Sequence, residues 1–137
     1  MRLIHGLIAG SALAAAPAFA AAPQVSGRWL TEGGKAIVEI APCGQHLCGH
    51  IVRIVKPDPG KPLNDANNPA EGLRSRPILG LAILFGFKPG ADRWKGQIYD
   101  PQSGRTYRSE LLREGGTLKV KGCLGPFCRT QDWSKAG

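Results

Sequence analysis

The sequence predicts an all-β domain in which an antiparallel meander of strands closes into a barrel. Apolar and polar residues alternate with a period of two over residues 35–40, 94–99 and 117–121, which is typical of strands with one buried face. Clusters of Gly, Pro, Asn, Asp and Ser separate such stretches at short intervals, as turns between neighbouring strands do. An open meander would leave two unpaired strand edges, so we expect the sheet to close on itself.

The first twenty residues are predicted to be a signal peptide. Arg2 supplies the positive start, residues 7–16 are almost purely apolar, and Ala18-Phe19-Ala20 places small residues at the expected cleavage site. A membrane anchor is the alternative, but it would need about twenty strongly apolar residues, and this segment also contains Gly, Ser and Pro. We therefore expect residues 21–137 to form one exported domain, either periplasmic or secreted.

The predicted mature chain carries a positive charge. The leader holds one of the 18 basic residues and no acid, which leaves 17 basic against 10 acidic residues and a net charge of +7. The basic residues are scattered, which favours a role in solubility. Anionic lipid, lipopolysaccharide or a wall polymer is the alternative partner for such a surface. We expect no nucleic-acid partner and no stable membrane insertion, and the pattern predicts no particular oligomeric state.

Three strands are expected early in the mature chain, over residues 24–31, 35–40 and 50–56. A long connection follows, because residues 57–72 are dense in Pro, Asn, Asp and Gly. The apolar run at residues 78–87 is too short to span a membrane. Two glycines in this run disfavour a helix, so we expect a buried strand or a wall of the core.

The last third of the chain shows the clearest strand pattern. Short turn sequences containing glycine separate the apolar stretches, and no helical period of useful length occurs after the leader. The strands expected here cover residues 94–99, 106–113, 117–121 and 129–134.

Four cysteines, all in the predicted mature chain, form two pairs with C-x4-C spacing. Each pair brackets a short turn-like insert. If each insert is a hairpin loop, the bracketing cysteines face each other across two strands at a distance that a disulfide accepts. Export also exposes the thiols to an oxidising compartment. The predicted disulfides are Cys43–Cys48 and Cys123–Cys128.

A metal site is the alternative use of the first cysteine pair. Zinc knuckles and ribbons usually have C-x2-C spacing, and exported thiols tend to be oxidised, so disulfides are favoured. We expect no metal and no other cofactor. The four possible ligands within eight residues are Cys43, His46, Cys48 and His50.

Five segments of the mature chain carry a family resemblance. They are GRWLT at 27–31, AIVEIAPCG at 36–44, LRSRPILGL at 73–81, GQIYDPQSGRTY at 96–107 and RTQDW at 129–133. In this order they resemble an exported bacterial family known as domain of unknown function 2147. The resemblance implies a lipocalin-like β-barrel of about eight strands in the cell envelope or beyond it, and it brings no established activity, substrate or catalytic residue.

A weaker likeness to lipocalins implies a structural pair. Those barrels begin with a G-x-W strand and place an arginine near the last strand over the tryptophan. Here Gly27, Trp29 and Arg129 stand in the same order. The implied cation–π contact would close one end of the barrel and contribute about 1–2 kcal/mol when shielded from water. Trp29 and Arg129 are therefore assigned to stability.

No catalytic residue is expected. The sequence contains none of the common nucleophile-elbow, zinc-protease, phosphate-loop or dinucleotide motifs. The histidines of the mature chain stand beside the first cysteine pair. Glu39, Glu110 and Asp132 fall on expected strands and could form an inward-facing acid pair, but solvated strand faces are the favoured interpretation.

Arg74 and Arg76 are the strongest ligand-binding candidates, because they stand between a long connection and an apolar run. Two guanidinium groups at the rim of an apolar cavity would bind the carboxylate or phosphate of an amphiphile. Trp94, Tyr99 and Tyr107 would supply aromatic lining. Alternatively, both arginines tie down the connection by bonding backbone carbonyls and acids such as Asp65 or Asp100.

The sequence supports three hypotheses about function. The first is a protein that binds a small apolar or amphiphilic ligand in or at the mouth of the barrel. The second is an envelope interaction or structural module with a packed interior and a basic outer face. The third, less favoured, is a small hydrolase or isomerase.

Overall fold

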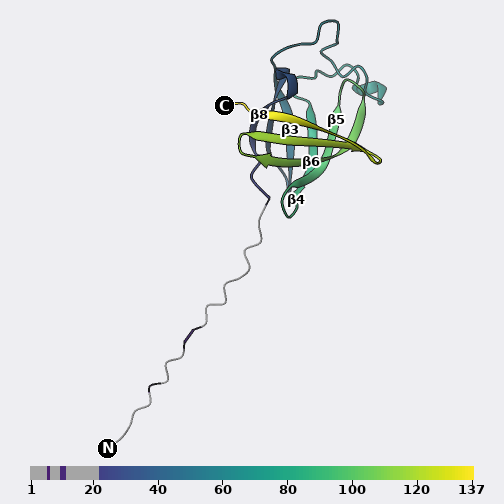
Figure 1. The fold of residues 1–137 in the computed structure, drawn as a ribbon. Coiled ribbons are helices and arrows are strands. Elements are labelled where there is room, and N and C mark those ends of the chain that lie inside the picture. Colours follow the sequence, from purple (N-terminus) through teal and green to yellow (C-terminus); the bar gives the residue numbers. More distant parts are fainter. Residues whose placement is uncertain (1–5, 7–9, 12–21) are drawn as a thin grey trace, which may run out of the picture.

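The computed structural model describes residue 6, residues 10–11 and residues 22–137. Its eight strands form a closed antiparallel barrel in which each strand pairs with the next and β8 pairs with β1 (Figure 1). This confirms the predicted meander, its closure and the strand number. The strands are β1 (Gly27–Leu30), β2 (Ala36–Cys43), β3 (His46–Ile54), β4 (Ala82–Pro89), β5 (Trp94–Asp100), β6 (Arg105–Glu114), β7 (Thr117–Leu124) and β8 (Phe127–Lys135).

Two short 3-10 helices, η1 (Glu32–Gly34) and η2 (Glu71–Leu73), lie in connections between strands. Within the described part of the chain, no helix has the length and apolar character needed to cross a membrane. The predicted signal peptide, residues 1–20, lies outside the described residues except at positions 6, 10 and 11, and stays a prediction.

Both cysteine hairpins turn more tightly than the sequence pattern predicts. Only two residues separate β2 from β3, and only two separate β7 from β8, so the strands run through the four-residue inserts. Each turn begins with a glycine at positive φ, 66° at Gly44 and 58° at Gly125. That backbone conformation closes a two-residue hairpin turn and is strained for other residues.

The structure contains both predicted disulfides. Cys123 and Cys128 face each other directly, with their Cα atoms 4.1 Å apart. Cys43 and Cys48 are joined across a diagonal, because Cys48 is in register with Ala41, and their Cα atoms are 5.5 Å apart. The sulfurs are therefore not available as thiolate ligands. Among the described residues, no group of three or more His, Cys, Asp or Glu side chains could hold a metal ion.

The apolar run expected as one strand at residues 78–87 is divided in the structure. β4 begins only at Ala82, and residues 78–81 belong to the β3–β4 connection. Gly80 takes a φ of 89° and donates its backbone N–H to the carbonyl of Ile51 at 2.7 Å. This bend lays the first part of the run across β3 and leaves Leu79 exposed, so the run does not form a uniformly buried wall.

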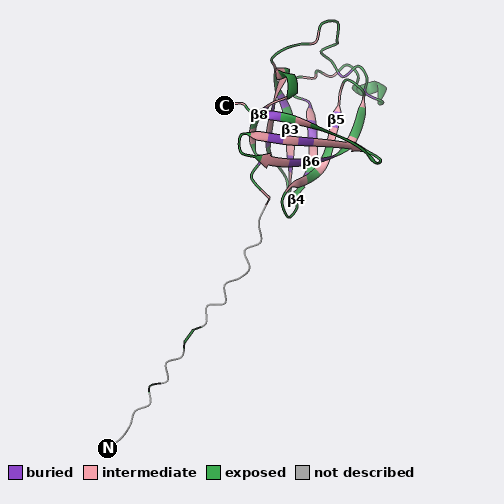
Figure 2. Ribbon diagram, in the orientation of Figure 1, coloured by how far each residue is buried: buried purple, intermediate pink, exposed green. Residues whose placement is uncertain are grey.

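One end of the barrel is filled by a cluster of buried apolar side chains, and the buried positions lie along the strands of the barrel wall (Figure 2). Large side chains fill it, and glycine leaves room for them: a Cβ at Gly96 would lie 2.7 Å from the ring of Phe87. The chain before β1 runs along this end, where Trp94 Nε1 donates to the carbonyl of Pro23 at 2.9 Å. The fully buried side chains of this core include Trp29, Val38, Leu84, Phe87, Leu111 and Leu118.

Arg113 is the cation that lies over Trp29. The prediction that Arg129 would occupy this position is wrong. The Arg113 Cζ atom lies 5.3 Å from the Trp29 ring centroid. Trp29 pairs with Lys135 across the β1–β8 seam, which puts Arg129 six residues away along β8. Six residues of strand span about 20 Å, so Arg129 belongs to the other end of the barrel. Gly27, Trp29 and Arg129 do lie on the first and last strands, as expected, but strand register decides which side chain reaches the indole.

Candidate functional site

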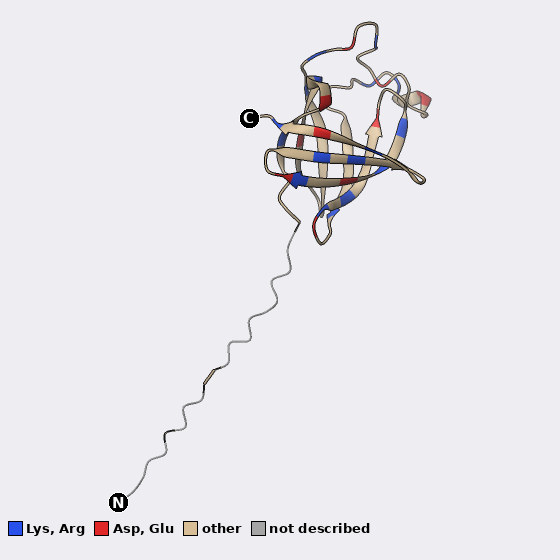
Figure 3. Cartoon of the chain, in the orientation of Figure 1, with Lys and Arg blue, Asp and Glu red and all other residues tan. Residues whose placement is uncertain are grey.

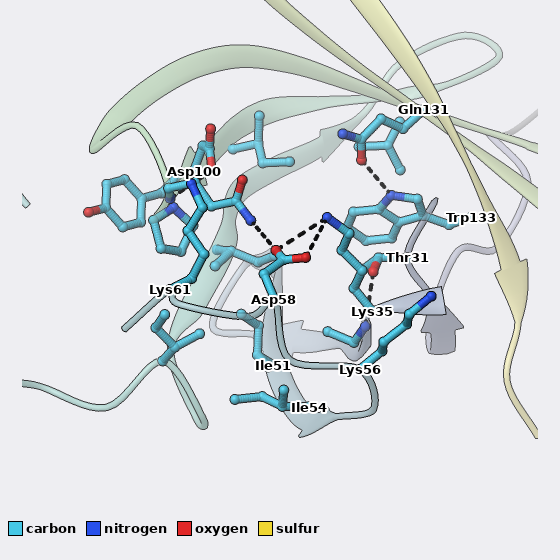
Figure 4. Close-up of a pocket in the computed structure, with 18 of the residues that line it drawn as sticks. Thr31, Lys35, Ile51, Ile54, Lys56, Asp58, Lys61, Asp100, Gln131 and Trp133 are labelled. Atoms are coloured by element: carbon cyan, nitrogen blue, oxygen red, sulfur yellow. Dashed lines mark hydrogen bonds and ion pairs between the residues drawn. The ribbon is translucent and has the colours of Figure 1, made fainter. Parts of the chain in front are cut away.

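A cavity of about 420 Å³ opens at the end of the barrel opposite the packed core. This open end is formed by the β1–β2 connection with η1, the β3–β4 connection, the β5–β6 turn and the tip of the β7–β8 hairpin. The inner part of the cavity is apolar, and the mouth carries charged and amide side chains (Figure 4). Its apolar walls include Ile51, Ile54, Ile78, Ile83, Ile98, Val120 and Trp133.

The apolar walls follow from strand alternation. Val120 on β7 and Trp133 on β8 occupy inward positions and are buried. The indole Nε1 of Trp133 donates to the side-chain oxygen of Gln131 at 2.9 Å, so its polar atom has a partner within the cavity wall. The inner wall is thus apolar, and its indole N–H has a partner, which suits the apolar part of a ligand.

Three connections are joined by hydrogen bonds at the mouth (Figure 4). Asp58, in the β3–β4 connection, pairs with Lys35 Nζ at 3.0 Å and accepts a hydrogen bond from Gln102 Nε2 at 2.9 Å. The hydrogen bond from Lys35 is the main cause that lowers the pKa of Asp58, against opposing desolvation. Asp58 therefore stays ionised and holds its connection to the β1–β2 and β5–β6 connections.

The mouth also carries cations that this bridge does not use. Lys56, Lys61 and Arg129 line the cavity and are exposed. None of the three forms an ion pair with any residue that the structure describes. Asp100 is the other lining carboxylate, and it accepts the backbone N–H of Gln102 at 3.0 Å. The mouth thus has an excess of positive charge beside an apolar interior.

Among the described residues, those that line this cavity do not include Arg74 or Arg76. They fasten the β3–β4 connection, as the alternative interpretation of the sequence predicts. Arg74 Nε donates to the carbonyl of Asn68 at 2.8 Å, and Arg76 Nε donates to the carboxylate of Asp65 at 2.9 Å. Arg76 also borders a smaller hollow of about 270 Å³ outside the barrel.

Asp65 is the centre of that fastening and is fully buried. It accepts hydrogen bonds from Tyr99 Oη at 2.5 Å and Asn68 Nδ2 at 2.8 Å, besides the guanidinium of Arg76. Burial raises the pKa of Asp65, but the three hydrogen bonds outweigh it, so the pKa stays below its usual 3.8. Burial and the bond to Asp65 raise the pKa of Tyr99 to about 12.

The three predicted aromatic residues have different positions. Tyr107 lines the cavity from β6. Tyr99 also borders it, but its hydroxyl is committed to Asp65 on the outer side of β5. Trp94 lies at the packed end, where its indole bonds the carbonyl of Pro23. The structure thus brings the two tyrosines to the cavity and separates the tryptophan from them.

The side chains considered for catalysis lie away from the mouth. His46 begins β3 at the packed end, and His50 is exposed on the same strand. The three carboxylates considered as an acid pair are all engaged in ion pairs. Glu39 pairs with Arg28, and Asp132 pairs with Lys119. Glu110 pairs with basic residues on β5 and β7.

The sequence analysis did not identify the polar residues at the cavity mouth, which are Lys35, Lys56, Asp58, Lys61 and Gln102. They lie in turns and connections, where polar residues are ordinary and carry no periodic signal. The density of turn formers in the long connection was the one hint that a loop could shape the site. Their gathering at one barrel end depends on the closure of strands far apart in sequence.

Comparison with known proteins agrees with this fold. No curated protein sequence matches the chain. Among solved structures, a Helicobacter pylori protein described as belonging to the lipocalin family, HP1028, aligns with a TM-score of 0.71 and 22% identity, covering 83% of this chain and 84% of that one. A family model described as an uncharacterised protein conserved in bacteria (DUF2147) matches residues 27–135, from the first residue of β1 to the last of β8. The chain therefore belongs to the DUF2147 family of bacterial proteins.

Proposed function

We propose that this protein binds a small amphiphile with an anionic head group, with its apolar part inside the barrel and its head at the mouth. The observation that carries the proposal is the cavity of about 420 Å³ with apolar walls and basic rim. Ordinary ligand pockets measure about 300–1,000 Å³ and combine apolar lining with a few placed polar groups. The lipocalin-like fold is compatible with this use.

The charge distribution supports an anionic head. Lys35 is engaged with Asp58, whereas the exposed Lys56, Lys61 and Arg129 leave positive charge at the rim. A carboxylate or phosphate placed there would be attracted by these groups while its chain displaced water from the apolar interior. This head-group site replaces the predicted one at Arg74 and Arg76, which are occupied by Asn68 and Asp65.

Export to the periplasm or beyond is part of the same proposal. Two disulfides are compatible with an oxidising compartment, and the leader pattern of residues 1–20 supports secretion. The interaction-module alternative requires a packed interior, and the cavity argues against it. The simplest enzyme alternative used the histidines, which lie away from the cavity mouth.

A displacement assay tests the proposal. The protein, expressed with its leader so that the disulfides form, is loaded with the fluorescent anion 1-anilinonaphthalene-8-sulfonate and titrated with dodecanoate or dodecyltrimethylammonium. We expect dodecanoate to displace the probe at lower concentration than the cation does. Val120→Trp, which fills the cavity, should abolish displacement. Unchanged displacement in this variant, or a preference for the cationic amphiphile, would overturn the proposal.

Charge variants test the head-group site separately. Lys56→Gln with Lys61→Gln should weaken dodecanoate binding by about tenfold, because two neighbouring cations are lost. The matched control is Lys88→Gln with Lys95→Gln, two exposed lysines on β4 and β5 that are not among the cavity-lining residues. Equal losses in the two double variants would show that overall charge, and not this rim, attracts the ligand.

A further inference from the structure

The tip of the β7–β8 hairpin displays two large apolar side chains to water. Leu124 and Phe127 are direct cross-strand partners on either side of the two-residue turn. Leu124 is 49% exposed, and Phe127, at 80%, is the most exposed large apolar side chain in the described part of the molecule. The hairpin projects from the barrel wall, and its tip is exposed (Figure 2).

This display is held rigidly. The Cys123–Cys128 disulfide joins the two strands one position before the apolar pair. Arg108 Nη2, from the neighbouring strand β6, donates to the carbonyl of Gly125 in the turn at 2.6 Å. These two contacts fix the backbone of the turn, so a partner that accepts the phenyl ring of Phe127 meets a preformed hairpin at little ordering cost.

Other exposed apolar side chains lie at the same end of the barrel. Strands alternate in direction, so the β3–β4 connection and the β7–β8 tip leave the barrel at the end that holds the cavity mouth. Of the seven exposed large apolar residues among those described, six lie in these two connections or their adjoining strand ends. They are Val55, Leu63, Leu73, Leu79, Leu124 and Phe127.

The strands that carry the tip are basic. Residues 105–109, 120–124 and 127–131, the tip halves of β6, β7 and β8, contain four basic residues and no acidic one. The outer half of the hairpin accordingly shows basic and no acidic positions (Figure 3). Within the described part of the chain, Arg105, Arg108 and Arg129 form no ion pair.

We propose that the open end of the barrel docks on an anionic lipid bilayer. Phe127 and Leu124 would enter the boundary between head groups and acyl chains, and Arg105 and Arg108 would bind lipid phosphates. Apolar side chains beside Lys and Arg are the combination that holds proteins at a membrane interface. A specific protein partner would instead need a continuous complementary surface of about 800 Å². The apolar groups here stand on separate connections, which suits a fluid lipid surface better.

Docking in this orientation would turn the cavity mouth toward the lipid. An amphiphile could then pass between bilayer and barrel without its chain crossing water. The docking proposal does not depend on ligand binding, because it uses the tip and its flanking arginines and not the cavity walls.

Vesicle sedimentation tests the proposal. The purified protein is mixed with phosphatidylcholine vesicles that contain or lack phosphatidylglycerol. We expect it to sediment with the anionic vesicles, and binding should fall as NaCl is raised, because salt screens the head-group contacts. Phe127→Ser with Leu124→Ser should weaken partitioning by about tenfold or more, since the protein loses the two apolar side chains that would enter the bilayer. Binding that is equal for both vesicle types, or absent from both, would overturn the proposal.

Matched variants separate the tip from general effects. Val52→Ser, at an exposed apolar residue on the wall of β3, should leave partitioning unchanged. Arg105→Gln with Arg108→Gln should weaken it more than Lys88→Gln with Lys95→Gln, which removes the same charge elsewhere. An unchanged midpoint of urea unfolding for the Phe127→Ser/Leu124→Ser protein would show that the fold is intact. If the tip variant sediments like the Val52→Ser protein, the tip is not the docking site.

A tryptophan reporter gives a second measurement. In Phe127→Trp, the added emission over the three native tryptophans should shift to shorter wavelength on anionic vesicles and be quenched by lipids brominated near the head group. Emission that stays at its value in water while the protein sediments would place the tip outside the bilayer and contradict the proposed orientation.

Discussion

The hydroxyl of Tyr99 donates a 2.5 Å hydrogen bond to the fully buried carboxylate of Asp65. This contact joins the long β3–β4 connection to the outer side of β5, 34 residues later in the chain. Asn68 and Arg76 complete the set of donors, so the carboxylate is fully engaged. The same connection forms part of the cavity mouth, and its attachment therefore shapes the candidate site.

Asp65→Asn should destabilise the protein by about 2–4 kcal/mol. The substitution removes a buried charged acceptor and leaves Arg76 without its partner. Urea unfolding measures the loss. Asp132→Asn, which breaks the exposed pair with Lys119, is the control and should cost less than about 1 kcal/mol. Equal losses in the two variants would contradict a central role for Asp65.

Low pH should weaken the same contact in the unsubstituted protein. Because the folded pKa of Asp65 is lowered, the unfolded chain takes up a proton first as pH falls. The stabilising contribution is complete above the unfolded pKa of about 3.9 and is lost as pH falls through the lower folded pKa. Unfolding measured over this range should show a steeper loss in the wild type than in Asp65→Asn.

High pH should destabilise the fold through Tyr99. Its folded pKa of about 12 lies above the unfolded value of about 10, so the folded state holds the proton more tightly. The protonated Tyr99 hydroxyl thus contributes about 2–3 kcal/mol to the free energy of unfolding. This contribution is complete below about pH 10 and is lost as the pH rises toward 12. The Tyr99→Phe protein should not show this loss of stability at high pH, whereas the Tyr107→Phe protein should show it as the wild type does. Parallel unfolding curves for wild type and Tyr99→Phe would disprove the assignment.

Arg113→Gln should destabilise the packed end by about 1–2 kcal/mol. The guanidinium lies over Trp29 and donates to the carbonyls of Gly115 at 2.9 Å and Gln24 at 3.0 Å. Arg129→Gln, at the exposed position first expected to cap Trp29, should change stability by no more than about 0.5 kcal/mol. Thermal unfolding of both variants measures the difference, and the reverse order of effects would contradict a stabilising contact between Arg113 and Trp29.

Gly96→Ala should destabilise by about 1–3 kcal/mol through overpacking. Its Cβ would lie 2.7 Å from the Phe87 ring and 2.8 Å from a backbone oxygen of β4. Gly122 offers a matched control, because a Cβ there would meet Ile98 and Tyr107 at 3.7 Å. Gly122→Ala should therefore stay within about 0.5 kcal/mol of the wild type. Chemical denaturation measures the free energy of unfolding of both variants. A Gly96→Ala protein as stable as the wild type would show that the packed end can rearrange to accept the methyl group.

Asp58→Asn should loosen the connection over the cavity mouth. It removes the ion pair with Lys35 and weakens the contact with Gln102. Backbone amides of residues 55–63 should then exchange with deuterium faster, while the strand amides keep their protection. Asp92→Asn, in an exposed turn at the other end, should leave this segment unchanged. Equal exchange in wild type and Asp58→Asn would show that other contacts hold the connection.

The strands and disulfides could be predicted because their signals are local. Alternation such as that at Leu118 and Val120 identifies a buried face within a few residues, and C-x4-C spacing places Cys123 opposite Cys128. The boundaries were less accurate where a glycine changed the path. Gly80 bends the apolar run into two parts, and Gly44 shortens a predicted loop to two residues.

By itself, the sequence determined the all-β class, the order of strands and the two cysteine pairings. Only the tertiary structure decided that Arg113 covers Trp29, that Arg76 binds Asp65, and that the mouth is built by Lys35 and Asp58. The physical reason is the range of the interactions. Periodicity and tight turns act over a few residues, whereas barrel closure and the path of a long connection bring together side chains that no local pattern relates.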